Sequence, residues 1–131
     1  MSSTCVDIKA ARDRDRVFFV IKSMATRIGM GTVKQTQVIT AVSELVSNIL
    51  KYAGEGQVCI SVTGEGGVKK IVVLASDNGP GIADINLAMT KGYSTGKTLG
   101  VGLPGAKALS DEFEVDTASG SGTVVRIAKW V

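Results

Sequence analysis

The hydrophobic period of this chain changes near Gly54, and this change constrains the fold more than any other feature of the sequence. Residues 12–28 and 32–52 repeat apolar side chains three and four positions apart, which predicts two consecutive amphipathic helices. The following segments, 58–62 and 70–75, alternate or run apolar over short lengths, which predicts two strands joined by a glycine-rich turn. Consecutive helices followed by hairpin strands predict an α+β domain in two layers.

Further elements complete the predicted order. They are a strand over 4–10, a short helical segment over 85–89, a glycine-rich loop over 90–102, a helix over 103–109, and strands over 112–117 and 123–130. This order predicts a two-layer α/β sandwich with a mixed, mostly antiparallel sheet and helices on one face. A length of 131 residues suits one domain with one core, so residues 1–131 are assigned to a single domain.

The absence of histidine narrows the chemistry that the chain can perform. Catalytic triads, zinc sites and phosphoacceptors that depend on an imidazole are all excluded. A general base in this chain must therefore be a carboxylate, a lysine, a tyrosine or a cysteine.

Charge and cysteine content limit the partners that the protein can have and the compartment in which we expect it. The net charge of +3 comes from scattered basic residues and argues against a nucleic-acid partner. No apolar run reaches the roughly 20 residues of a membrane span. The sign-alternating run 12–16 is expected at the solvent-exposed start of a helix. Cys5 and Cys59 lie far apart and no signal peptide precedes them, so we expect reduced cysteines and a cytoplasmic location.

Two polar groups stand next to the predicted core. Glu44 and Asn48 are four residues apart and share a face of the second helix, where a carboxylate beside an amide oxygen suits a general base beside a Mg²⁺ ligand. Asp77 ends the strand predicted from the apolar run 71–75, which is expected to be buried and central, and enters a glycine-rich turn. Taken singly, each group also fits an ordinary alternative, a surface polar pair or a tight turn.

Glycines and a threonine in the second half supply two more candidates. Gly100, Gly102 and Gly105 open the helix over 103–109, where glycine-rich backbone favours anion binding. Their spacing imitates a dinucleotide fingerprint, and residues 96–98 imitate the end of a P-loop, but both lack the preceding strand that those motifs require. Thr123 begins the last strand and could contact a ligand, although a β-branched residue is ordinary there.

Together and in this order, these motifs resemble those of the GHKL, or Bergerat-fold, ATP-binding superfamily. The matching segments are ELVSN at 44–48, DNGPGI at 77–82, TLGVGL at 98–103, and the Gly-Thr pair at 122–123. The short chain and the missing histidine resemble the anti-sigma-factor type of serine/threonine protein kinase within that superfamily. The segment AVSELVSNILKYAGEGQ at 41–57 is similar to the stressosome switch kinases of this type.

The resemblance implies ATP and Mg²⁺ as cofactors and a role for each matched residue. Asp77 would receive the adenine amino group, supported by Thr123 directly or through water. Asn48 would hold the Mg²⁺ ion that bridges the phosphates, and Glu44 would take the proton from the substrate hydroxyl. The glycines that would shape the nucleotide-binding turn and lid are Gly79, Gly81, Gly100, Gly102 and Gly105. The cation near the γ-phosphate stays open between Lys97 and Lys51, and the lid hydroxyls Ser94, Thr95 and Thr98 stay unranked.

The implied function is an ATP- and Mg²⁺-dependent serine/threonine protein kinase. Its implied substrates are STAS-domain scaffold or antagonist proteins of a bacterial stressosome, and an activating phosphatase is a further implied partner. One alternative is a nucleotide-binding anti-sigma factor, or a phosphatase-regulating module, without essential kinase activity. A second alternative is a free-standing ATPase that needs no protein acceptor. Phosphotransfer to a STAS protein would separate the first reading from both alternatives.

Overall fold

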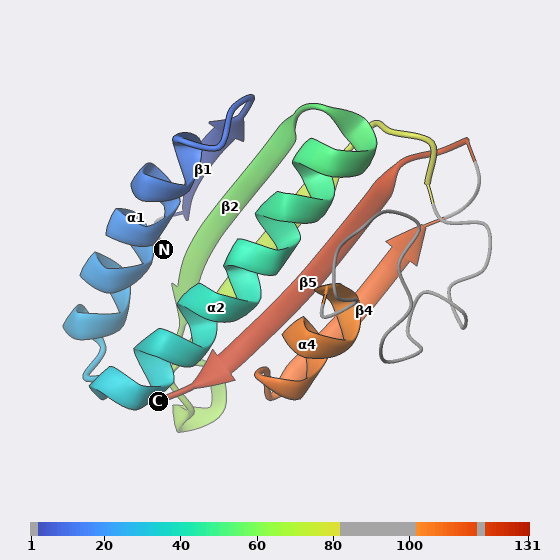
Figure 1. Cartoon of the computed structure of the whole chain (residues 1–131). Helices are drawn as coiled ribbons and strands as arrows, with labels where there is room; N and C mark the ends of the chain where they lie inside the picture. The colour runs from blue at the N-terminus through green and yellow to red at the C-terminus, as the bar shows by residue number, and fades with distance from the viewer. Residues whose placement is uncertain (1–2, 82–101, 118–119) are drawn as a thin grey trace.

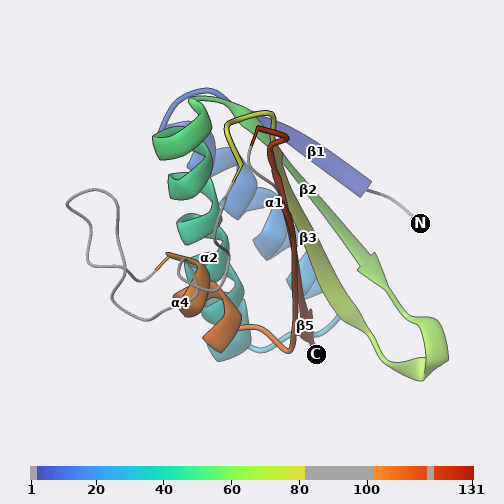
Figure 2. The same cartoon turned by 90° about the vertical axis from the view of Figure 1, so that its right-hand side faces the viewer.

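The computed structural model describes residues 3–81, 102–117 and 120–131, and they form the expected two-layer α+β arrangement (Figure 1). Five strands make one sheet in the order β1-β2-β3-β5-β4, and every described pairing is antiparallel. Helices α1, α2 and α4 cover one face of that sheet (Figure 2). The bounds are β1 Ser3–Ile8, α1 Asp13–Arg27, α2 Thr32–Asn48, β2 Gly56–Thr63, β3 Lys70–Asp77, α4 Gly102–Ala108, β4 Glu112–Thr117 and β5 Thr123–Trp130.

The end of the second helix differs from the sequence prediction, whereas the end of the third strand agrees with it. The helix expected over 32–52 changes its hydrogen bonding after Asn48, and a π-helical turn at Ile49–Ala53 leads to Gly54, which has a φ of 85°. Strand β3 continues past the predicted 70–75 to Asp77, which ends the strand as expected. The helical segment expected over 85–89 and most of the loop expected over 90–102 lie outside the described residues.

The hydrophobic core lies between the sheet and the helices. Strand residues alternate, so that one side chain in two is buried against the helices, as in an antiparallel sheet with one covered face. The helices contribute a stripe of apolar side chains at helical spacing. Fully buried side chains that carry this packing include Ile8, Ile21, Val42, Leu45, Ile60, Ile71, Val73 and Ile127.

The prediction that 71–75 forms a buried central strand is correct for its central position and for the face that meets the helices. Strand β3 is central, because it pairs with β2 and β5, and its Ile71 and Val73 are buried. Val72 is half-buried and Leu74 is 40% exposed, because no described helix covers the second face of the sheet. We call this second side the open face.

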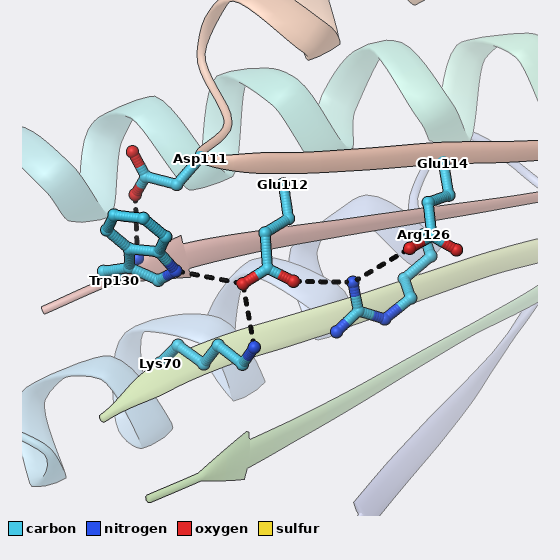
Figure 3. Close-up of polar contacts among 6 residues, drawn as sticks. All are labelled: Lys70, Asp111, Glu112, Glu114, Arg126 and Trp130. Atoms are coloured by element: carbon cyan, nitrogen blue, oxygen red, sulfur yellow. Dashed lines mark hydrogen bonds and ion pairs between the residues drawn. The ribbon is translucent and has the colours of Figure 1, made fainter. Parts of the chain in front are cut away.

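An ion-pair network centred on Glu112 spans three strands of the open face (Figure 3). Its carboxylate lies 2.8 Å from Lys70 Nζ and 3.0 Å from Arg126 Nη1. The Trp130 indole N–H also donates to it at 3.0 Å. These three donors, led by the bond from Lys70, lower the pKa of Glu112 to about 2. The network therefore ties β3, β4 and β5 together at the end of the sheet away from Asp77.

The expectation of reduced cysteines is wrong for this structure. Cys5 and Cys59 face each other across β1 and β2 and form a disulfide bond, although 54 positions separate them in the sequence. Their distance along the chain gave no indication of the pairing, because the register of two antiparallel strands decides which residues lie opposite.

The charged run 12–16 is also not wholly solvent-exposed. Arg14 is half-buried and donates a hydrogen bond to Ser47 Oγ, which joins the start of α1 to the end of α2. Its Nε atom is buried and has no hydrogen-bond partner among the described residues. Asp13 accepts the backbone N–H groups of Lys9 and Ala10 at 2.8 and 2.9 Å, and these bonds lower the pKa of its carboxyl.

Candidate functional site

The last turn of α2 presents the predicted polar pair beside the start of α4. Glu44 and Asn48 are both half-buried and lie one helical turn apart. Gly102, the first residue of α4, packs against the second of them: a Cβ added at Gly102 would lie 3.3 Å from Asn48 Oδ1 and 3.4 Å from Nδ2. The sequence predicted all three residues as site members. Helix α4 packs against α2 (Figure 1), and this packing brings Asn48 and Gly102 together.

Asp77 lies at the end of β3, on the side of the sheet that faces the helices. Its position follows from the alternation that buries Ile71, Val73 and Ala75 on that side. Asp77 Oδ1 accepts the backbone N–H of Gly79 at 2.8 Å, which fixes the orientation of the carboxylate. The strand and the turn after it therefore position this side chain together.

Gly79 is needed because the turn after β3 packs tightly against the π-helical turn that follows α2. A Cβ at Gly79 would lie 2.7 Å from Ala53 Cβ, which is closer than such atoms approach in proteins, and 3.1 Å from Ala53 Cα. This contact holds the Asp77 turn against the segment that continues from Asn48. Gly81 has a φ of 74° and ends the described part of this turn.

Thr123 pairs directly with Asp77 in the register of β3 and β5. Its Oγ1 lies 2.9 Å from Thr117 Oγ1, and Thr117 also donates to the carbonyl of Gly122 at 2.9 Å. No sequence motif indicated Thr117. The signal available for it was the final hairpin, whose predicted strands 112–117 and 123–130 place these two threonines opposite each other.

The remaining predicted site residues make none of the contacts described above for Asn48, Asp77 and Thr123, or they lie outside the described residues. Gly105 lies inside α4, where its carbonyl accepts the N–H of Leu109 at 3.2 Å. Lys51 is exposed, with its ammonium 5.3 Å from the centroid of the Tyr52 ring. Gly100, Lys97, Ser94, Thr95 and Thr98 lie outside the described residues.

A hollow of 540 Å³ opens beside the end of β3. It is lined by Asp77 and Asn78 and, from neighbouring segments, by Asp7, Lys9, Ala53, Glu55, Gly56, Gln57 and Ser76. Asp77 borders this hollow at the end of its strand. Glu44 and Asn48 do not line this hollow.

The chemistry of the donor set fits a magnesium ion that is held mainly by a nucleotide. Within residues 3–81, 102–117 and 120–131, no cluster of three His, Cys, Asp or Glu residues could hold a metal. Mg²⁺ usually keeps several waters and takes one or two protein oxygens together with substrate phosphates. The Asn48 amide oxygen is a donor of that kind, so the described residues suit a nucleotide-borne ion better than a metal site built from the protein alone.

Comparison with curated proteins finds matches over nearly the whole chain. A Bacillus subtilis protein named serine/threonine-protein kinase RsbT is 44% identical over 125 residues, which is 95% of this chain and 90% of the relative. A protein named anti-sigma F factor from Caldanaerobacter subterraneus is 30% identical over 117 residues, covering 86% of this chain and 81% of the relative. None of the helices in the described part of the chain combines the length and apolar character that crossing a membrane requires.

Solved structures share the fold. The RsbU and RsbW domains of a Mycobacterium tuberculosis protein superpose with a TM-score of 0.62 at 17% identity, covering 98% of this chain and 32% of that one. The mycobacterial sensor histidine kinase MprB superposes with a TM-score of 0.60 at 18% identity, covering 98% and 97% of the two chains. The family model for histidine kinase-, DNA gyrase B- and HSP90-like ATPases matches residues 33–130, and the chain belongs to this family.

Proposed function

We propose that this chain is an ATP- and Mg²⁺-dependent serine/threonine protein kinase that acts as a partner switch in bacterial stress signalling. The observation that carries the proposal is the 44% identity, over 95% of the chain, to a protein named as a serine/threonine kinase. The packing of Asn48 against Gly102 and the pairing of Asp77 with Thr123 support it further.

Asp77 and Thr123 are the proposed contacts of the adenine base. A carboxylate held at a strand end accepts a hydrogen bond from the exocyclic amine of adenine, which is a donor. The Gly79 N–H holds one carboxylate oxygen in place, so the carboxylate is oriented before the base arrives. Thr123, directly beside Asp77, offers a hydroxyl to the base or to a bridging water.

Asn48 and the glycines are the proposed contacts of the phosphate tail. Asn48 would hold, through its amide oxygen, a Mg²⁺ ion that accompanies ATP and that would supply charge neutralisation for the phosphates. Gly102 lets the start of α4 approach the Asn48 side chain, where a larger residue would press on the carboxamide. Gly79, Gly81, Gly100 and Gly105 complete the proposed nucleotide set.

Glu44 is the proposed general base. It lies one turn before Asn48 on α2, so a phosphate held by a metal at Asn48 would lie within its neighbourhood. The chain has no histidine, so a carboxylate is the natural acceptor for the proton of a serine or threonine hydroxyl. Phosphoryl transfer depends mainly on positioning and charge stabilisation, which these residues supply.

The proposed protein partners are STAS-domain scaffold or antagonist proteins as substrates and an activating phosphatase as the alternative binding partner. A kinase of this kind phosphorylates its scaffold, leaves it and binds the second partner. Such a switch in bacterial stress signalling belongs in the cytoplasm, which is the proposed location.

The deciding experiment combines phosphotransfer with nucleotide binding. The protein is incubated with γ-labelled ATP, Mg²⁺ and a STAS-domain scaffold protein, and the labelled residue is located by mass spectrometry. Asp77→Asn is expected to lose ATP binding, whereas Glu44→Ala is expected to bind ATP and lose phosphotransfer. Asp116→Asn and Glu114→Ala, at exposed positions of β4, are the matched controls. Full activity in both site variants would contradict the proposal.

A second candidate function is favoured by the matches to proteins named anti-sigma F factor. In that case the chain would sequester a sigma factor or regulate a phosphatase, and bound nucleotide would serve only to hold the structure. Both candidates predict ATP binding. Labelled phosphate on a serine or threonine of the scaffold supports the kinase, whereas tight sigma-factor binding without transfer supports the second candidate.

A further inference from the structure

The disulfide between Cys5 and Cys59 lies on the open face of the sheet. The two residues are directly opposite in the β1–β2 register, with their Cα atoms 3.9 Å apart. Their neighbours Val6, Val58 and Ile60 are buried towards the helices, so the alternation of the strands turns both cysteines the other way. Cys5 is exposed and Cys59 is half-buried. A small thiol in solution can therefore reach this bond.

The surroundings of the pair connect it to the proposed nucleotide site. Strand β1 is an edge strand that pairs only with β2 among the described strands. Three residues before Cys59, Gly56 pairs with Ile8 on one side and with Asp77 on the other. A Cβ at Gly56 would lie 3.2 Å from Asp77 Cβ and 2.8 Å from Ile49 Cγ2. The start of β2 therefore packs closely against the first carbon of the Asp77 side chain.

We propose that Cys5 and Cys59 form a reversible redox-modification site for small thiols and disulfides of the glutathione class, and that its oxidised state favours nucleotide binding at Asp77. The coupling rests on the proposed function. A kinase that uses ATP works in a reducing compartment, where protein disulfides are mostly transient or sensory. With the bond closed, β1 is linked covalently to β2. The bond then keeps Ile8, Gly56 and Asp77, which lie opposite one another on three neighbouring strands, in register. With the bond open, the edge strand β1 detaches from β2 more easily, and the pairing of Ile8, Gly56 and Asp77 becomes less rigid.

The chemistry balances with two equivalents of the small thiol. One thiolate attacks the exposed Cys5 sulfur, a mixed disulfide forms there, the protein S–S bond breaks, and Cys59 leaves as a thiolate that takes up a proton. A second thiolate attacks the sulfur of the small molecule in that mixed disulfide, and Cys5 leaves as a thiolate that is protonated in turn. The protein disulfide gains two electrons, and the two small thiols are oxidised to one disulfide. Oxidation of the protein reverses these steps.

The test begins with a redox titration of the full-length protein. It is equilibrated in mixtures of glutathione and glutathione disulfide, free thiols are trapped with iodoacetamide, and masses are measured. We expect the ratio of reduced to oxidised protein to be proportional to the square of the thiol concentration divided by the disulfide concentration, and circular dichroism to stay native throughout. Cys59→Ser should accumulate a mixed disulfide on Cys5, whereas Cys5→Ser should react more slowly because Cys59 is half-buried. A pair that stays oxidised until the protein unfolds, or stays reduced at every ratio, would overturn the site.

Nucleotide affinity is measured on the same samples with a fluorescent ATP analogue. We expect the reduced protein to bind about two- to tenfold more weakly, because a smaller share of molecules holds the binding-competent arrangement. The double variant Cys5→Ser/Cys59→Ser should bind like the reduced protein under all conditions. Binding that is equal in both redox states would overturn the coupling alone. No binding in either state would overturn the proposed nucleotide site and the coupling together, while the titration would still decide whether the cysteines exchange.

Discussion

Gly122 is the residue at which a single methyl group should disturb the candidate site most directly. It is buried, has a φ of 79°, and precedes Thr123 at the start of β5. A Cβ added there would overlap the Asp77 carbonyl oxygen and lie 3.2 Å from Asn78 Cα. The change Gly122→Ala therefore forces either the final hairpin or the turn after β3 to move.

The cost has two parts that can be separated. A non-glycine residue in left-handed backbone costs about 1–2 kcal/mol. Overpacking against fixed neighbours adds about 1–3 kcal/mol. The sum is about 2–5 kcal/mol, which corresponds to a fall in Tm of roughly 8–20 °C for a domain of this size. Gly120→Ala is the matched control, because Gly120 has a φ of 81° in the same hairpin but no atom within 4 Å of an added Cβ. Only the backbone cost of about 1–2 kcal/mol applies to the control.

Thermal and urea denaturation of both variants, with ATP-analogue binding, test this reasoning. Gly122→Ala is expected to lose more stability than Gly120→Ala and to bind ATP more weakly, because the displaced backbone carries Asp77. Gly120→Ala should bind ATP like the unaltered protein. Equal losses of stability in the two variants, with unchanged ATP affinity in both, would show that the Gly122–Asp77 contact does not position the site.

Three further predictions concern charge, the disulfide and the metal. The pKa of Glu112 is lowered from 4.5 to about 2, so its network stabilises the fold above pH 4.5 and this contribution disappears as the pH falls to 2. The stability difference between the unaltered protein and Glu112→Gln, measured by urea denaturation, should shrink over that range, and a constant difference would contradict the ion-pair interpretation. Reducing the Cys5–Cys59 bond should lower the free energy of unfolding by about 4 kcal/mol, because the bond closes a loop with a sequence separation of 54; an unchanged urea midpoint after reduction would refute this. A Mg²⁺ chelator should abolish phosphotransfer, and Asn48→Ala should raise the Mg²⁺ concentration for half-maximal transfer by about tenfold or more; an unaltered Mg²⁺ dependence would exclude Asn48 as a ligand.

The sequence predicted those parts of the fold that depend on local periodicity. The helical stripes of α1 and α2 and the alternation of β4 and β5 are properties of contiguous residues, and their bounds agree with the prediction within a few positions. The neighbourhood of Glu44 and Asn48 was predictable for the same reason, since an i,i+4 pair on a helix needs no tertiary information. The family resemblance added the expectation that Asp77 and Thr123 act together, and the β3–β5 register makes them directly paired residues.

The residues whose burial or pairing was predicted wrongly are those whose surroundings depend on which distant segment packs over them or lies opposite them. Leu74 belongs to a run whose composition suits burial on both faces, yet the described helices cover only one face. Arg14 sits in a run of alternating charge, but the crossing of α1 and α2 turns its guanidinium towards Ser47. Cys5 and Cys59 meet because two strands share a register, which composition and spacing do not reveal.

Asp77 shows how such non-local information bears on function. Read locally, Asp-Asn-Gly-Pro is a turn, and a turn aspartate often accepts the backbone N–H two residues on, as Asp77 does from Gly79. In the sheet, Asp77 is the last residue of a central strand, with Gly56 opposite on one side and Thr123 on the other. Neighbours on both sides restrict its backbone, and the Gly79 N–H restricts its side chain. A carboxylate held in this way does not have to be ordered when a nucleotide binds, so less of the binding free energy is lost to ordering it. Backbone from three segments meets at Asp77, and this explains the glycines at 56, 79 and 122. A Cβ added at any of these three positions would collide with that backbone or with Ala53.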